Sequence, residues 1–204
     1  MYEKYGQFID GKWHKSSSGE TYEVINPANE EIIGKASKAS PEDVDKALLS
    51  AQKGLEVWKK TPPWQRAYIL RRIADKMREK QDILAKWMTL EVGKPFAEAK
   101  GEVNGAADIY EWNAEETKRI YGQTVESRFE DTRVHVYYQP VGVVAALVPW
   151  NFPLVLSARK ISTALAAGCS VIVKPDVITP GVVMEQVEIC RECGVPPGLS
   201  LIHI

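Results

Sequence analysis

One segment, residues 139–180, most constrains what this chain can fold into: QPVGVVAALVPWNFPLVLSARKISTALAAGCSVIVKPDVITP. An apolar run (141–148) ends at PWNFP, a helical pattern follows over 154–167, and a second apolar run (170–173) ends at Lys174. Near-continuous apolar strands are typical of parallel sheets that are buried on both faces. Joined through a helix, the two strands predict a right-handed βαβ unit and therefore an α/β fold.

A polar side chain follows each of these two strands, namely Asn151 and Lys174. Open α/β sheets bind ligands outside the carboxyl ends of their strands. An Asn amide held between Pro149 and Pro153 offers two N–H donors to a developing oxyanion, and a lysine suits a ribose hydroxyl or a phosphate. The alternative is that Asn151 caps the following helix and that Lys174 is a solvated charge at a strand end.

The first 121 residues predict strands followed by helices. The Asp10-Gly11 pair favours a tight hairpin over 9–13, and strand patterns follow at 22–25 and 31–36. Ser40-Pro41-Glu42-Asp43 is typical of a helix start, with a capping hydroxyl and early acidic residues. Apolar residues at helical spacing then predict helices that end near Trp58 and that span about 64–79, 82–91 and 96–120.

Residues 122–138 interrupt the helical pattern. Arg133 to Tyr138 alternate as a strand does, and an acidic loop near Glu130-Asp131 is suited to a hairpin turn. A two-stranded hairpin is marginal on its own, so this one is expected to find a partner edge.

Several motifs together resemble the aldehyde dehydrogenase superfamily, nearest to its succinate-semialdehyde dehydrogenase-like members. They are FIDGKW (8–13), INPANEEIIGKA (25–36), TLEVGKP (89–95), PWNFP (149–153) and ALAAGCSVIVKP (164–175), in the order and spacing of that family. The resemblance implies the N-terminal part of a Rossmann-like NAD(P)-binding domain (1–121 and 140–198), incomplete and without the catalytic domain. It also implies an oligomerisation hairpin (122–139) and a parent that is a homodimer or homotetramer.

The resemblance assigns roles to individual residues. Asn151 would donate to the oxyanion of a thiohemiacetal, and Lys174 would contact the adenosine ribose of NAD or NADP. The cofactor-binding residues that it implies are Val148, Pro149, Trp150, Lys174, Asp176 and Val177. NAD-preferring members often carry Glu where this chain has Val177, and Asp176 replaces that carboxylate at most in part. We therefore expect either cofactor.

Arg159 follows Asn151 by eight residues. In semialdehyde dehydrogenase-like members, an Arg at this place pairs with the distal carboxylate of the substrate, a group that the guanidinium fork can bind bidentately. The alternative is an exposed helix-surface arginine beside Lys160.

These features predict a portion of an enzyme that oxidises an aldehyde through a covalent thiol intermediate and hydride transfer, with a carboxylate-bearing semialdehyde as one candidate substrate. In the family the nucleophilic Cys and general-base Glu lie further downstream, so the 204-residue chain alone is expected to be inactive. A non-catalytic nucleotide-binding or structural homologue is the alternative. The final LSLIHI (199–204) departs from the family, and we interpret it as a non-native tail encoded by sequencing adapter; a natural strand is the alternative.

Composition narrows the class of protein. The chain has 45% hydrophobic and 26% charged residues, which suits a packed core, and its net charge of −1 provides no basic surface for nucleic acid. No signal-peptide core or membrane span is evident, so a cytoplasmic location and no membrane partner are expected. Of the three cysteines, Cys169 is expected to pack as a small hydrophobe, and Cys190 and Cys193 are interpreted as helix residues without a metal.

Overall fold

The computed structural model describes residues 2–198 and 200–201. Its main sheet has the strand order β2-β1-β9-β8-β7. The strands are β1 (Gln7–Ile9), β2 (Lys12–His14), β7 (Val143–Leu147), β8 (Ser170–Lys174) and β9 (Ser200–Leu201). β7, β8 and β9 are parallel, whereas β1 runs antiparallel to β9. The predicted α/β fold with parallel strands is confirmed, and the first hairpin adds an antiparallel edge.

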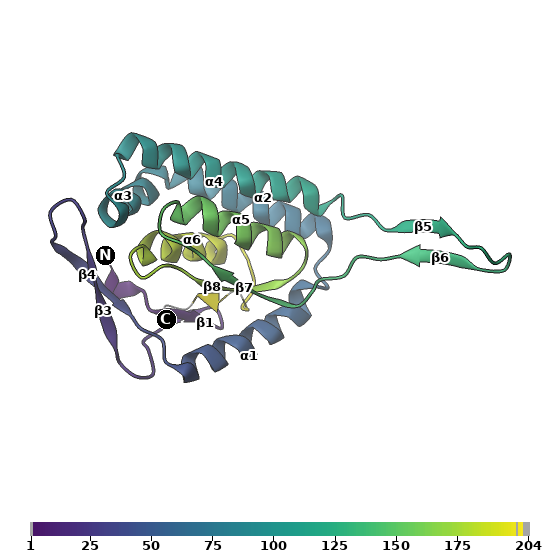
Figure 1. The fold of residues 1–204 in the computed structure, drawn as a ribbon, viewed down its shortest axis with the longest axis horizontal. Helices are drawn as coiled ribbons and strands as arrows, with labels where there is room; N and C mark the ends of the chain where they lie inside the picture. The colour runs from purple at the N-terminus through teal and green to yellow at the C-terminus, as the bar shows by residue number, and fades with distance from the viewer. Residues whose placement is uncertain (1, 199, 202–204) are drawn as a thin grey trace.

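Helices cover both faces of the sheet (Figure 1). They are α1 (Pro41–Trp58), α2 (Pro63–Glu79), α3 (Gln81–Val92), α4 (Phe96–Thr117), α5 (Pro153–Ala166) and α6 (Pro180–Glu192). α1 contacts one face, α5 and α6 lie on the other, and α2 and α4 pack outside them. Position 147 of β7 pairs with position 174 of β8, so the two strands end side by side.

The predicted helices are present within a few residues of their expected bounds. Ser40 caps α1 through a capping box with Asp43, as its sequence indicates. On α4 the expected apolar stripe is fully buried: Val103, Ala106, Ala107 and Tyr110. This helix ends at Thr117 rather than near residue 120, because the N–H of Lys118 bonds back to Glu115 in a tighter final turn.

The described chain forms three hairpins, and the first of them is the antiparallel edge of the main sheet. Asp10 and Gly11 take φ angles of 53° and 76°, the left-handed turn that their sequence predicts. The second hairpin pairs β3 (Thr21–Ile25) with β4 (Ile32–Ser37). The third pairs β5 (Gln123–Glu126) with β6 (Arg133–Val136) and projects far from the helices (Figure 1). Its second strand stops two residues before the predicted end.

The cysteines and the last residues complete the fold. Cys169, Cys190 and Cys193 are free thiols buried in the core, in agreement with the expectation that Cys169 packs as a small hydrophobe. Cys190 lies on α6, as expected, and Cys193 is the C-cap residue of that helix. Of the predicted tail, positions 200 and 201 form β9, while 199 and 202–204 lie outside the described residues. Main-chain pairing between strands accepts many sequences, so the presence of β9 does not test whether this tail is native. The non-native tail stays a prediction. Within the described chain we find no helix that is long and apolar enough to span a membrane.

Candidate active site

The PWNFP loop joins β7 to α5 and presents Asn151. Phe152 is the N-cap of α5, and no side-chain hydrogen bond caps this helix from that position. The alternative in which Asn151 serves as the cap is therefore wrong. Asn151 is exposed, and its side-chain amide has no hydrogen-bond partner among the residues that the structure describes. Both of its N–H donors are available to a ligand.

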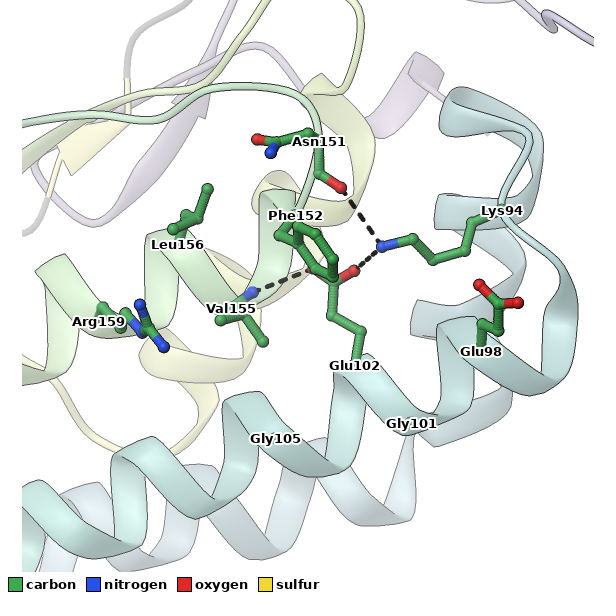
Figure 2. Close-up of a pocket in the computed structure, with 10 residues that line it drawn as sticks. All are labelled: Lys94, Glu98, Gly101, Glu102, Gly105, Asn151, Phe152, Val155, Leu156 and Arg159. Atoms are coloured by element: carbon green, nitrogen blue, oxygen red, sulfur yellow. Dashed lines mark hydrogen bonds and ion pairs between the residues drawn. The ribbon is translucent and has the colours of Figure 1, made fainter.

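Asn151 and Arg159 line the same hollow, which lies between α4 and α5 and measures about 480 Å³ (Figure 2). Its lining residues are Lys94, Glu98, Gly101, Glu102, Gly105, Asn151, Phe152, Val155, Leu156 and Arg159. Arg159 is exposed on α5, and within the described chain its guanidinium makes no ion pair. The structure thus brings together the expected oxyanion donor and the expected carboxylate partner, one on the loop and one on the helix behind it.

A second pair of residues in this hollow, Lys94 and Glu102, was not expected from the sequence. Glu102 is buried, with a side-chain exposure of 2%, and its Oε1 accepts the N–H groups of Leu154 and Val155 at 3.0 and 3.2 Å. These are free donors of the first turn of α5, where a carboxylate also meets the positive end of the helix dipole. Glu102 therefore supplies from α4 the cap that Phe152 does not.

Lys94 connects that buried carboxylate to the PWNFP loop. It forms an ion pair with Glu102, donates to the backbone carbonyl of Asn151 at 3.4 Å, and lies 4.1 Å from the ring centroid of Phe152. The sequence does signal that Glu102 needs a partner, although not which residue provides it. Glu102 occupies an inward position between Ala99 and Val103 on the apolar face of α4, where an unpaired carboxylate would be costly.

The expected cofactor residues gather at the ends of β7 and β8. Val148, Pro149 and Lys174 line a hollow of about 450 Å³ together with Leu147. The N–H of Val148 bonds to the carbonyl of Lys174 at 2.9 Å and ties the two strand ends together. This apolar floor with one ammonium at its edge fits a nucleoside, whose base needs an apolar surface and whose hydroxyls need a polar partner.

The other three expected cofactor residues follow β7 and β8 in the sequence and are not among the residues that line this hollow. Trp150 and Val177 are exposed, at 50% and 44%. Asp176 accepts the N–H of Ile178 at 3.1 Å, so one carboxylate oxygen stabilises its own turn. Asn151 and Lys174 line two different hollows in the described chain. Lys94, in the turn between α3 and α4, donates to the backbone carbonyl of Asn151 (Figure 2).

Comparison with known proteins identifies the family. The profile described as "Aldehyde dehydrogenase family" matches residues 13–202. The chain belongs to the aldehyde dehydrogenase family. Among curated relatives it is 44% identical over 192 residues to glutarate-semialdehyde dehydrogenase of Pseudomonas aeruginosa, covering 94% of this chain and 40% of the relative. It is also 44% identical over 191 residues to the NADP(+) succinate-semialdehyde dehydrogenase GabD of Escherichia coli, with the same coverage.

Solved structures of aldehyde dehydrogenases have the same fold over this region. A structure described as an E. coli NADP dependent enzyme superposes with a TM-score of 0.95 at 42% identity, over 97% of this chain and 41% of that one. Betaine aldehyde dehydrogenase of Staphylococcus aureus in complex with NAD+ gives a TM-score of 0.95 at 34% identity, over 98% of this chain and 41% of that one. The chain therefore spans about 40% of the length of the curated relatives above.

Proposed function

We propose that the protein containing this chain oxidises an aldehyde to a carboxylate with NAD or NADP, and that Asn151 stabilises the oxyanion formed on the way. The observation that carries the proposal is the free amide of Asn151 at the mouth of a hollow that Arg159 also lines. A preorganised donor with no competing partner is what oxyanion stabilisation requires. The family of the chain supplies the reaction class.

The thiol nucleophile of such a reaction would come from outside the residues described here. Cys190 is fully buried beside Tyr110, and burial raises the pKa of its thiol to about 12. Burial also raises the pKa of Cys193. Thiols of this kind hold their protons at neutral pH and are poor nucleophiles. Cys169 is buried at the start of β8. We accordingly propose that the 204-residue chain alone does not turn over aldehydes.

The cofactor would be bound at the ends of β7 and β8. Lys174 would hold a ribose hydroxyl, while Val148 and Pro149 would provide the apolar surface beneath the nucleoside. When bound, the nicotinamide accepts a hydride from the substrate. Relatives and related structures carry both cofactors in their descriptions, NADP(+) for the E. coli enzyme and NAD+ for the S. aureus enzyme. Val177 leaves no acidic side chain at its position to repel a 2′-phosphate.

The substrate is proposed to be an aldehyde with a distal anionic group. Glutarate and succinate semialdehydes bear carboxylates, and the relatives also include a 3-sulfolactaldehyde dehydrogenase of Pseudomonas putida, whose substrate bears a sulfonate. Arg159 is the exposed cation in the hollow that contains Asn151 and has no protein counter-ion in the described chain. A guanidinium without a partner suits an anionic group of the ligand.

The test is an assay of the complete protein with succinate and glutarate semialdehyde and each cofactor, following the absorbance of the reduced nicotinamide. We expect turnover, and we expect Asn151→Ala to lower kcat about 10²- to 10³-fold, as loss of one oxyanion donor does. Asn29→Ala, in the exposed β3–β4 turn, is the matched control. A complete protein that binds NAD or NADP but reduces neither with any aldehyde would instead support the non-catalytic class.

A further inference from the structure

The backbone and the side chain of Asn151 point in different directions (Figure 2). Its carbonyl oxygen is directed toward Lys94 Nζ, 3.4 Å away, and its side-chain amide is directed away from that lysine. Because the peptide unit is planar, holding this carbonyl oxygen also fixes the orientation of the bond between Asn151 and Phe152. The contact made by Lys94 therefore constrains the backbone from which the free amide projects.

Lys94 is itself held on several sides. Its side chain is 11% exposed, and it contacts the carboxylate of Glu102, the carbonyl of Asn151 and the ring of Phe152. Gly93 precedes it at the C-terminus of α3 with a φ of 74°, a left-handed conformation that lets the chain turn sharply into Lys94-Pro95. A lysine that is buried and paired in this way has little rotamer freedom left.

Glu102 joins this lysine to the helix that follows the loop. One oxygen of Glu102 binds the first-turn N–H groups of α5, and the other pairs with Lys94. The loop from Pro149 to Phe152 is thus held at its end by Glu102 through α5, and at Asn151 by Lys94. The two contacts act on the same short segment.

We propose that Lys94 and Glu102 are positioning residues for the oxyanion donor: they hold the Asn151 amide in the orientation that the reaction needs. This inference rests on the proposed function. The ammonium of Lys94 acts on the backbone of Asn151, and Glu102 acts through Lys94 and α5. A displacement of about 1 Å at a reacting group can lower a rate about 10²-fold, so an orientation device of this kind has a measurable effect.

The primary test is Lys94→Met in the complete protein, which keeps the aliphatic stem and removes the ammonium. We expect kcat to fall about 10- to 100-fold, while KM for the cofactor changes by less than about twofold. The KM for the cofactor is expected to change little because the hollow lined by Lys174 does not include Lys94 or the residues that Lys94 contacts. Lys100→Met is the matched control, since Lys100 lies on the same helix as Glu102 and its ammonium contacts Asp82, at 2.6 Å, and the Phe96 ring instead of the PWNFP loop.

A second variant covers the case in which Lys94→Met leaves the buried Glu102 charge uncompensated and the protein does not fold. The pair Lys94→Met with Glu102→Gln is neutral and can retain an oxygen acceptor for the α5 N–H groups. It still lacks the donor to the Asn151 carbonyl, so the same fall in kcat is expected.

The decisive measurement repeats the lysine change in an Asn151→Ala background. If Lys94 acts by orienting the Asn151 amide, removing that amide first makes the lysine change nearly silent, with less than about a twofold further loss in kcat. An equal fold-loss in both backgrounds would overturn the inference and leave Lys94 a structural residue. An inactive wild-type protein would instead refute the proposed dehydrogenase function, so the two failures are distinguishable.

Discussion

Glu91 and Glu102 occupy equivalent positions at two neighbouring helices. Glu102 accepts the N–H groups of the second and third residues of α5, and Glu91 accepts those of Gly181 and Val182, the second and third residues of α6, at 2.6 and 3.1 Å. Both helices begin with a proline, and neither receives a side-chain hydrogen bond from its own N-cap residue. Buried carboxylates from other helices therefore cap the first turns of α5 and α6, the two helices on one face of the sheet.

The two carboxylates differ in their other partner. Glu102 pairs with a cation, Lys94, whereas the third donor to Glu91 is the neutral hydroxyl of Tyr2, at 2.5 Å. Burial raises the pKa of Glu91 to about 7, although the hydrogen bonds from Tyr2, Gly181 and Val182 act in the opposite direction. The desolvation of a carboxylate that meets no cation outweighs its hydrogen bonds.

We predict that the stability of the chain falls as the pH rises from about 4.5 to about 7. The folded state holds the proton of Glu91 more tightly than the unfolded state, so the free energy of unfolding decreases across this window and is level above it. A pKa shift from 4.5 to about 7 changes the free energy of unfolding by roughly 3 kcal/mol across this window. Urea unfolding at a series of pH values should show that slope, and Glu91→Gln should remove it.

Glu98→Gln provides the control, because Glu98 is an exposed glutamate on α4. It should keep the slope of the unchanged chain. A Glu91→Gln protein whose stability still declines between about pH 4.5 and 7 would assign the effect to another group.

Sequence patterns predicted the elements better than they predicted how the site is held. Strand ends, helices and the 9–13 hairpin follow from apolar periodicity and from turn residues, which act locally. The cap from Glu102 to α5 joins positions 52 residues apart, and no local pattern encodes such a contact. The contact from Lys94 to the Asn151 carbonyl likewise joins positions 57 residues apart.

Replacing Arg159 with Ala should selectively harm substrates with a distal carboxylate. A charge-assisted hydrogen bond contributes about 1.5–3 kcal/mol, so KM for succinate semialdehyde is expected to rise roughly 10- to 100-fold in the complete protein. An uncharged aldehyde of similar length should be affected less than about threefold. Equal losses on both aldehydes would return Arg159 to the alternative of a helix-surface arginine.

Val177 offers a test of cofactor choice. Val177 is 44% exposed beside the turn that Asp176 stabilises, so a longer side chain there meets solvent or ligand. Val177→Glu is expected to raise KM for NADP about tenfold relative to NAD, because a carboxylate near a 2′-phosphate is repulsive. Val177→Gln has nearly the same shape without the charge and should leave that ratio within about twofold of its original value. If Gln shifts the ratio as far as Glu does, size rather than charge is responsible.

The projecting hairpin carries the final prediction, on self-association. Its strands expose Val125 at 44% and Val134 at 42%, directly opposite each other across the β5–β6 pair. Because a two-stranded hairpin is marginal on its own, we predict that another subunit covers this surface. Val134→Lys in the complete protein should therefore shift its mass, measured by light scattering after gel filtration, toward the monomer.

The matched control for this change is Ile32→Lys, which also replaces an exposed aliphatic residue on a two-stranded hairpin, at the opposite end of the molecule (Figure 1). It adds the same charge and should leave the mass unchanged. A Val134→Lys protein with the original mass would show that β5–β6 does not hold the subunits together. If both variants dissociate, net charge rather than the hairpin surface governs the association.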